Sequence, residues 1–483
     1  MNLIKDPYLL SLVFGISYAC HKIKNFFGDV WLYNTISELN TLKTDAPHDA
    51  ILGKEPTEYE WAFIKTVLLG LRKYCVFVLR YVFIRGGKRP TSSTIINTLV
   101  ITYSGSNYPF DECRDEFLDL PLTIISLPTK GIWRRKEITS DYVIDNFINL
   151  VDFILVPILW ARTFTKFLLM RYWKPLWAAI ENIPHCEQFC KEGGWITYWE
   201  EDLWRSLGGD VCIEGLFYNQ AFKRIGEVVN EKTIVLYPKE GQGWEKLLEK
   251  HIKAKTIGIM FSYPSPFSLN FFNATPESYG VIYPDAEVFE YAQTMFGGSC
   301  NAKIDYHLFD RSSLPTEITD IEKDTMLIIF GVNMKQNATF LSELLNKLTP
   351  EGSNYKLVVK AHPDNSKRQV QKLARSRSVS IKVVTEIDIE LFNRIAYAVV
   401  FNSSFSVDLL NAGITVIVPN GPIGGYLPTV PLPGANEIKT SKLFVTDFTT
   451  GFVEVRRNRY IALDQNGGSI RTKIKEMANE AGA

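Results

Sequence analysis

Two apolar runs in the second half of the chain, residues 356–360 and 398–401, are each followed closely by side chains that can bind an anion. The residues that follow them are His362, Pro363, Asn402, Ser403 and Ser404. An imidazole can donate a hydrogen bond to a phosphate oxygen, and hydroxyl groups at the start of a helix lie where backbone N–H groups can bind anions. Together the motifs predict a phosphate-binding site. Taken singly, each also fits a histidine bonded to a backbone carbonyl or simple helix capping.

Two carboxylates lie between these motifs. Glu386 and Glu390 follow the apolar run 381–384, and a carboxylate beyond the end of a strand can accept hydrogen bonds from ribose hydroxyls. The two side chains compete for this role, and the one that does not fill it is an ordinary surface charge.

Short apolar runs along the chain predict the strands that must position these side chains. They are residues 95–103, 124–127, 211–213, 233–236, 256–260, 326–330, 356–360, 381–384, 398–401 and 415–418. Most of the later runs are separated by helical or polar stretches, which is typical of parallel sheets covered by helices. Because the carboxyl ends of parallel strands meet at one edge, His362 and Ser403 are expected at the same edge. The pattern predicts an α/β protein with two Rossmann-like domains facing a cleft and extra N-terminal helices.

The order of these motifs resembles the donor half of bacterial glycosyltransferases of the GT-B fold. A strand leads into His-Pro, an acidic-Leu segment follows, and another strand leads into Asn-Ser-Ser, a helix, a glycine and a further strand, within residues 230–425. The likeness is greatest to the CMP-sugar-using enzymes of capsule and lipopolysaccharide synthesis, which are sialyltransferase-like or Kdo-transferase-like. It implies a metal-independent transferase that moves an acid sugar from CMP to a hydroxyl of a surface glycan or glycolipid.

The resemblance also implies roles for individual residues. In this family the His-Pro histidine and the Ser-Ser hydroxyls hold the nucleotide phosphate, so His362 is assigned both a catalytic and a binding role. The donor-binding set that we expect is His362, Pro363, Glu386, Glu390, Asn402, Ser403 and Ser404.

A general base is implied in the first half of the chain. Related enzymes carry an acidic residue followed by glycine at the end of a strand, and Glu240 with Gly241 fits this pattern. Burial raises the proton affinity of a carboxylate, as proton removal from an alcohol requires. The alternative is that Glu240 caps a helix starting near Gly243. The family's Gly-x-x-His turn is not matched, because Phe261 stands in the histidine position. The expected acceptor contacts are Ser262, Tyr263 and Trp244.

The expected organisation has four parts. They are a helical segment (1–90), a Rossmann-like acceptor domain (91–295), a Rossmann-like nucleotide-sugar domain (296–425) and a tail that crosses back to the acceptor domain (426–483).

Composition excludes several classes of protein. With 53 Lys and Arg against 53 Asp and Glu in 483 residues, the chain has no cationic surplus for nucleic acid. No Asp-x-Asp sequence occurs, so we expect neither a metal-bridged diphosphate site nor a cofactor. Seven cysteines without a CxxC pair, and no evident signal peptide, predict a cytoplasmic chain. His185, Cys186 and Cys190 fit buried thiols better than a zinc site.

Two long segments, residues 61–84 and 143–177, mix large apolar residues with lysine and arginine at helical spacing. Such segments either lie in a membrane interface or form core helices whose basic side chains extend into water. The pattern leaves both open, and a peripheral association with the inner face of a membrane is one expectation.

Other activities fit the same motifs. The nearest is a CDP-polyol phosphotransferase of teichoic-acid-like polymer synthesis, which also uses His-Pro and Ser motifs. A catalytically inactive scaffold that keeps the fold is another. A sugar epimerase with the same two halves is less expected, because nothing resembles its additional acid–base residues.

Overall fold

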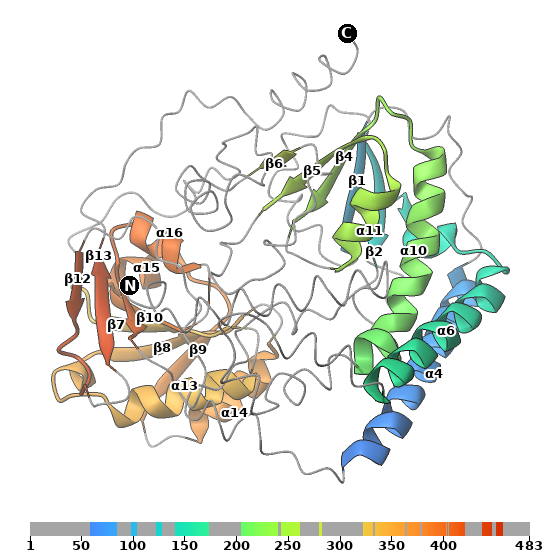
Figure 1. The fold of residues 1–483 in the computed structure, drawn as a ribbon. Helices are drawn as coiled ribbons and strands as arrows, with labels where there is room; N and C mark the ends of the chain where they lie inside the picture. Colours follow the sequence, from blue (N-terminus) through green and yellow to red (C-terminus); the bar gives the residue numbers. More distant parts are fainter. Residues whose placement is uncertain are drawn as a thin grey trace, which may run out of the picture. The chain divides into compact units, whose positions relative to one another are not determined.

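The computed structural model describes two compact units, each built on its own sheet (Figure 1). The described residues are 58–84, 98–103, 122–127, 141–172, 204–239, 243–260, 280–282, 322–331, 334–362, 365–376, 379–401, 403, 405–420, 437–446 and 451–456. Those up to residue 282 belong to the first unit and those from residue 322 onward to the second. The domain boundaries expected near residues 90, 295 and 425 all lie outside the described residues.

The first unit contains a six-stranded parallel sheet in the order β3-β2-β1-β4-β5-β6. Its strands are β1 (Thr98–Tyr103), β2 (Leu122–Leu127), β3 (Tyr142–Val143), β4 (Ile234–Pro238), β5 (Lys255–Ile259) and β6 (Gly280–Ile282). The chain moves outward from β1 to β3 and returns to the other side of β1 with β4. This is a Rossmann-like order, in which the direction of winding reverses between β1 and β4.

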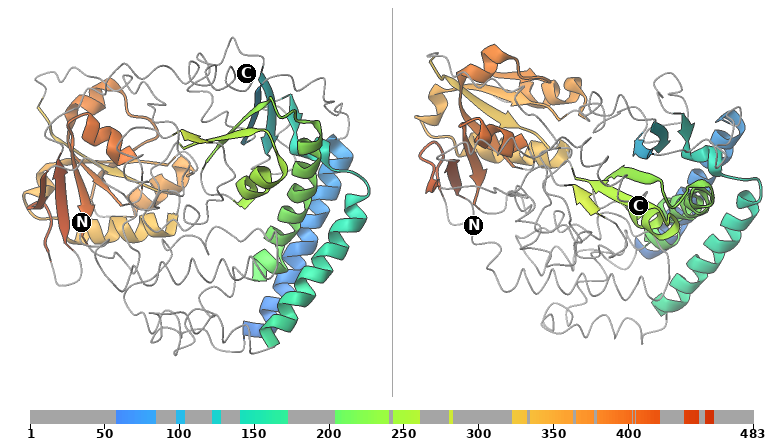
Figure 2. Two further views of the ribbon diagram at one scale, coloured as in Figure 1. Left: turned by 45° about the horizontal axis from the view of Figure 1, so that its top comes forward. Right: turned by 90° about the horizontal axis from the view of Figure 1, so that it is seen from above.

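Helices pack against this sheet through alternate strand residues. They are α4 (Glu58–Ile84), the 3₁₀ helix η4 (Ile144–Phe147), α6 (Asp152–Tyr172), α10 (Asp210–Val228) and α11 (Gly243–His251). Leu99 and Ile101 of β1 share one core with Phe77 of α4 and Phe217 of α10, whose rings stack 4.3 Å apart. Helices α4, α6 and α10 lie side by side (Figure 2). In the part of the chain that the structure describes, no helix has the length and apolarity needed to cross a membrane.

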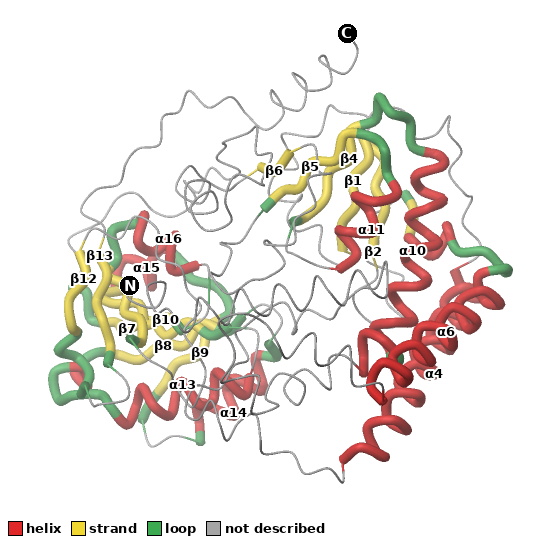
Figure 3. The backbone as a smooth tube through the Cα atoms, viewed as in Figure 1, coloured by secondary structure: helices red, strands yellow, loops and turns green. Residues whose placement is uncertain are grey.

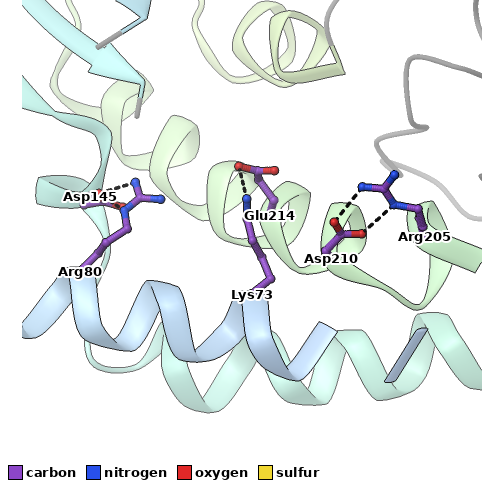
Figure 4. Close-up of polar contacts among 6 residues, drawn as sticks. All are labelled: Lys73, Arg80, Asp145, Arg205, Asp210 and Glu214. Carbon is purple, nitrogen blue, oxygen red and sulfur yellow. Dashed lines mark hydrogen bonds and ion pairs between the residues drawn. The ribbon is translucent and has the colours of Figure 1, made fainter. Parts of the chain in front are cut away.

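Ion pairs fasten these helices to one another (Figure 4). Between the elements they are Arg80 Nη2 with Asp145 Oδ2 at 2.5 Å, Lys73 Nζ with Glu214 Oε1 at 2.8 Å and, outside the figure, Arg224 Nη1 with Asp152 Oδ2 at 2.5 Å. A further pair, Arg205 Nη2 with Asp210 Oδ2 at 2.8 Å, links the start of α10 to the residues just before it. A buried charge needs such a partner, because burial without one costs several kcal/mol, on the order of 3–5. The pairs therefore allow charged residues to lie inside an otherwise apolar helical layer.

The second unit contains a seven-stranded sheet in the order β12-β13-β11-β10-β7-β8-β9. Its strands are β7 (Thr325–Ile329), β8 (Lys356–Lys360), β9 (Ile381–Val384), β10 (Ile395–Val400), β11 (Thr415–Pro419), β12 (Glu437–Thr440) and β13 (Phe452–Arg456). Strands β7 to β11 are parallel, whereas β13 pairs antiparallel with β11 and with β12. The chain starts at β7, winds outward to β9 and returns to the other side of β7 with β10. The winding therefore reverses between β7 and β10.

Helices cover both faces of the second sheet (Figure 3). They are α13 (Met334–Asn346), α14 (Lys367–Arg375), α15 (Ile389–Arg394) and α16 (Phe405–Asn411). Phe340 of α13 shares a core with Val359 of β8, whereas Leu410 of α16 shares a second core with Val358. Neighbouring residues of one strand point to opposite faces, so α13 and α16 lie on opposite sides of the sheet. Helix α16 is followed by Gly413 at φ 75°, the left-handed conformation that favours glycine after a helix.

Three segments differ from the sequence prediction. Residues 211–213 belong to α10 rather than to a strand, because a three-residue apolar run cannot by itself distinguish helix from strand. The helical stretch expected from residue 143 begins instead with β3 and η4. Residues 437–456, expected in a tail returning to the first domain, supply β12 and β13 to the second sheet.

The expected α/β class with two Rossmann-like units is confirmed. Both units are α/β, and both contain a parallel sheet wound in the Rossmann-like manner. The runs expected at 356–360 and 381–384 coincide with β8 and β9. In β8 the three central residues are buried and form a continuous apolar run, whereas β9 is the edge strand and its Lys382 is exposed.

Candidate functional site

The carboxyl edge of the second sheet gathers the polar residues expected to bind a ligand. In open α/β sheets, ligands bind beyond the carboxyl ends of the strands, at the point where the winding reverses. That point lies between β7 and β10. His362 comes two residues after β8, and Ser403 comes three residues after β10. The structure therefore places both residues beyond the expected edge.

Hydrogen bonds hold the loops after β7 and β8 together. Asn337 of α13 is buried, and its side chain accepts from Gly331 N at 3.0 Å and donates to Gly331 O at 2.8 Å. Asn365 Nδ2 donates to the same carbonyl at 2.8 Å, and its backbone N–H donates to His362 O at 2.9 Å. The backbone at half-buried His362 is thus tied through Asn365 to the end of β7, which limits its freedom to move.

A lysine reaches from β8 towards the loop after β10. The Nζ atom of Lys360 lies 5.3 Å from the centroid of the Phe405 ring, the first residue of α16. Burial lowers the pKa of Lys360 below that of an ordinary lysine. A partly desolvated ammonium at this edge attracts anions more strongly than one in water, because the local dielectric constant is lower.

Ser403 organises the start of α16. Its carbonyl accepts from the Oγ of buried Ser406 at 3.0 Å, and its own Oγ accepts from Phe405 N at 3.4 Å. The Ser403 hydroxyl therefore makes the local capping contact that the sequence analysis kept as an alternative. Its O–H group can still donate elsewhere, because capping uses only its acceptor side.

The two motifs follow strands that are not adjacent in the sheet. β7 lies between β8 and β10, and adjacent strands are about 4.8 Å apart. The tips of β8 and β10 are therefore separated by about 10 Å, two strand spacings. A gap of this size favours contacts from His362 and Ser403 to different parts of an extended ligand over a joint grip on one phosphate.

Glu386 and Glu390 lie farther along the same edge. Glu386 is exposed two residues after β9, the edge strand, and Glu390 is exposed in the first turn of α15. The neighbouring Asp388, rather than either glutamate, caps α15 by accepting from Leu391 N at 2.8 Å. Both glutamates are accessible to a ligand, and neither is distinguished from the other by its surroundings.

The corresponding edge of the first sheet carries a buried lysine. Lys239 follows β4, beside the reversal between β1 and β4, and is 7% exposed. Its Nζ donates to Tyr237 Oη at 3.3 Å, and its side chain lies over Gly258, where an added Cβ would be 2.7 Å from Lys239 Cδ. Glu240, the expected base, comes next in the sequence but lies outside the described residues.

Trp244 belongs to the core of the first unit. It is 2% exposed, and its ring lies 6.1 Å from that of Phe222 and 6.0 Å from that of Tyr237. A side chain enclosed in this way packs against protein and is not accessible to an acceptor, so Trp244 is a core residue rather than the expected acceptor contact.

The other expected site residues are not described by the structure. They are Pro363, Asn402, Ser404, Ser262 and Tyr263. The sequence analysis in turn did not select Lys360 or Lys239. A lysine at the end of an apolar strand was the available signal, and it is weak, because most such lysines simply extend into water. Among the described residues, no group of three or more His, Cys, Asp or Glu side chains is placed to hold a metal ion.

Comparisons with known proteins add fold likeness only. Neither the protein-family models nor the curated proteins give a match. Among solved structures, the UDP-GlcNAc 2-epimerase of Neisseria meningitidis bound to UDP-GlcNAc is 11% identical with a TM-score of 0.35, over 68% of this chain and 84% of that one. A putative UDP-N-acetylglucosamine 2-epimerase of Listeria monocytogenes is 9% identical with a TM-score of 0.35, over 67% and 79%. The MnaA–UDP structure of S. aureus is 11% identical with a TM-score of 0.28, over 66% and 78%. Similarity this low carries no argument about activity, and the fold class rests on the strand order of the two sheets.

Proposed function

We propose that this protein is a glycosyltransferase whose second unit binds a nucleotide-sugar donor. The observation that carries the proposal is the convergence of Lys360, His362 and Ser403 on the carboxyl edge where the second sheet reverses its winding. A cation, an imidazole and a hydroxyl on the two sides of β7 suit an extended ligand with an anionic linkage.

Each side chain of the proposed donor site has a distinct role. Lys360 and His362 stabilise the negative charge on the departing phosphate, and Ser403 donates a hydrogen bond to another part of the nucleotide. Glu386 or Glu390 accepts from the ribose hydroxyls. Pro363, Asn402 and Ser404, which lie outside the described residues, are proposed to complete the site.

The first unit supplies the base and the acceptor contacts in this proposal. The Glu240 carboxylate takes the proton from an acceptor hydroxyl, whose oxygen then forms a bond to the anomeric carbon of the sugar. The bond from that carbon to the nucleotide phosphate breaks, and its electron pair leaves with the phosphate. Ser262 and Tyr263 are the proposed contacts to the acceptor, a hydroxyl of a glycan or glycolipid.

CMP is the proposed leaving nucleotide. It carries a single phosphate, so a lysine and an imidazole can neutralise much of its charge without a bridging metal ion. The motif order around His362 and Ser403 resembles that of enzymes using CMP-linked acid sugars, and this resemblance is the support for CMP over other nucleotides.

Nucleotide binding provides the first test. A ligand at about 100 times its Kd adds about 2.7 kcal/mol to the free energy of unfolding, so the nucleotide that binds most tightly raises the melting temperature most. We expect this nucleotide to be CMP rather than CDP or UDP. Lys360→Met and His362→Ala should each remove most of this shift. The matched control is Lys382→Met, which removes an exposed lysine from β9 and should leave the shift intact. No shift with any nucleotide, or a full shift in both site variants, would contradict the proposal.

Product analysis provides the second test. A CMP-sugar supplied with a glycan acceptor should yield a glycoside and free CMP. Phosphate retained in the product would indicate a phosphotransferase instead. Nucleotide binding without turnover of any CMP-sugar would indicate an inactive scaffold.

A further inference from the structure

The outward face of α4 is apolar from Ile64 to Val82. Ile64, Leu68, Leu71, Cys75, Leu79 and Val82 are all exposed and recur every three or four positions, so they form a single stripe. The opposite side of the helix carries buried Phe77 and Arg80, which face the core and Asp145. An ordinary surface helix is polar on its outer face, so α4 departs from that pattern.

Helix α6 shows the same departure. Its outward positions are Ile154, Ile158, Ala161, Thr165 and Leu169, and all are exposed. Its inward positions include Val156 and Phe167, which are fully buried. Of the sixteen large apolar side chains that are exposed in the described part of the chain, twelve lie on α4, on α6 or at residues 150–151 just before it. The exposed apolar surface is thus concentrated in one place.

The two stripes lie on the same side of the helix pair. Phe63 near the start of α4 stacks on Phe164 of α6 at 5.5 Å, and Tyr81 near its end contacts Phe153 at 5.0 Å, so the helices are antiparallel neighbours. Both also pack against α10, through contacts that lie opposite the stripes. The α4–α6 face, defined here as the two outward stripes, is therefore directed away from α10.

The charges around the α4–α6 face are positive. Acidic residues occur only at the starts of the two helices, as Glu58 and Glu60 of α4 and as Asp152 of α6, which pairs with Arg224. The remaining residues, 61–84 and 153–172, contain no Asp or Glu. Arg80 and Lys73 are paired inward with Asp145 and Glu214 (Figure 4). Arg72 and Arg162 are exposed at the margins of the two stripes, one residue after Leu71 and one after Ala161. A large apolar face bordered by arginine matches an anionic lipid surface both in polarity and in charge.

We propose that the α4–α6 face binds the surface of a bilayer that contains anionic lipid. The two helices lie in the interface, with their stripes among the acyl chains and their arginines at the headgroups. At 1.5 Å per residue, the α4 stripe from Ile64 to Val82 extends about 27 Å, so the face offers a long contact. The inference goes beyond the proposed function, because lipid binding is measured without donor or acceptor.

Vesicle flotation of the full chain tests the proposal. The protein should float with vesicles of phosphatidylcholine mixed with phosphatidylglycerol, and much less with phosphatidylcholine alone. Leu68→Glu/Ile158→Glu should lower the bound fraction about tenfold or more on both kinds of vesicle, because two charges enter the apolar contact. Arg72→Glu/Arg162→Glu should lower it about tenfold on the anionic vesicles only, and raised salt should have a similar effect.

The control is Ile438→Glu, which alters an exposed isoleucine of the second unit and should leave flotation unchanged. Failure of the wild-type protein to float overturns the proposal, and so does flotation of Leu68→Glu/Ile158→Glu that equals that of the wild-type protein. A wild-type dimer in light scattering that Leu68→Glu/Ile158→Glu converts to a monomer assigns the face to a second copy of the chain instead. Loss of native circular dichroism in that variant shows that the face is covered by the chain itself, and also overturns it.

Discussion

Arg80 and Asp145 form a buried ion pair between α4 and η4. Arg80 Nε and Nη2 donate to Asp145 Oδ2 at 2.8 and 2.5 Å, and both residues are at most 5% exposed. Burial by itself would lower the pKa of Arg80, but the neighbouring carboxylate raises it above its ordinary value. The second oxygen, Asp145 Oδ1, is buried without a hydrogen-bond partner in the structure. The pair therefore fixes how α4 docks, at an electrostatic cost.

Removing one member of this pair should be worse than removing both. Arg80→Met is expected to lower the free energy of unfolding by about 3–5 kcal/mol, because it leaves a buried carboxylate without its partner. Arg80→Met/Asp145→Leu should recover much of that loss. Urea unfolding of the two variants measures the difference, with Arg205→Met in the more exposed Arg205–Asp210 pair as the control, costing about 1 kcal/mol or less. Equal losses in the single and double variants would contradict this.

Lys360 gives the donor site a predicted pH dependence. Its pKa is lowered by burial, so it loses its charge at a lower pH than an ordinary lysine. Binding of an anion that needs this charge should weaken as the pH rises through the lowered pKa. Lys360→Arg should keep its affinity at alkaline pH, because arginine stays protonated to above about pH 12. Calorimetric titration with CMP between about pH 7 and 10 measures both. If the wild-type protein and Lys360→Arg lost affinity for CMP equally as the pH rises, the charge of Lys360 would not be what binds the anion.

At the scale of elements, the crossing of α10 and α11 depends on a glycine. A Cβ added to Gly226 would lie 2.2 Å from the carbonyl oxygen of His251 at the end of α11. Helix α10 is central to the first unit, since α4, α6 and α11 all pack on it. The close approach allows α10 to contact α11 while its other face packs against Phe77.

Gly226→Ala should therefore destabilise the first unit despite the better helix propensity of alanine. The main-chain oxygen cannot turn away as a side chain could, so α10 and α11 must separate, at a cost of about 1–3 kcal/mol. Thermal unfolding measures this loss. Gly413→Asn is a useful contrast, because the left-handed residue after α16 has open space around its Cβ position and asparagine tolerates that conformation. A Gly226→Ala protein as stable as wild type would show that the helices adjust freely.

At the scale of the whole molecule, each unit has its own core. The first core unites α4, α10 and α11 with β1 and β4, whereas two others lie on opposite faces of the second sheet. Asp324, just before β7, ties three elements of the second unit together. It accepts hydrogen bonds from Lys356 Nζ at 2.6 Å and from Arg394 Nε at 3.0 Å. The hydrogen bond from Arg394 is the largest cause, followed by that from Lys356, of a pKa of Asp324 well below the usual range.

A carboxyl group whose pKa is depressed by folding stabilises the folded state most when the group is charged in both the folded and the unfolded chain. This contribution is full above the unfolded pKa of about 3.9 and is lost as the pH falls towards the folded value. Asp324→Asn should lower the melting temperature of the second unit at pH 7 and reduce its further loss in acid. Calorimetry from about pH 7 to 3 separates this from any effect on the first unit. The control is Glu351→Gln, which removes an exposed carboxylate of the same unit. An unchanged acid response in Asp324→Asn would contradict the argument.

The fold class and most of the strands of the second unit could be predicted from the amino-acid sequence alone. The run at β8 was bounded correctly because the strand is buried at Leu357, Val358 and Val359 and has a lysine at each end. The run at β9 was bounded correctly although this edge strand is only half-buried. The sequence also placed His362 and Ser403 beyond one sheet edge, since parallel strands share their direction. The sequence did not distinguish strand from helix at residues 211–213, because a run of three apolar residues is too short to show either the helical or the strand periodicity.

Which of these residues come together became evident only from the folded structure. It placed β7 between the two motif-bearing strands, brought Lys360 to Phe405 and enclosed Trp244 in the core. It also showed that α4 and α6, whose basic and apolar pattern had two interpretations, have both an inward and an outward apolar side. Periodicity along a chain reports local conformation, whereas strand order, burial and side-chain contact depend on residues far apart in sequence that meet only after folding.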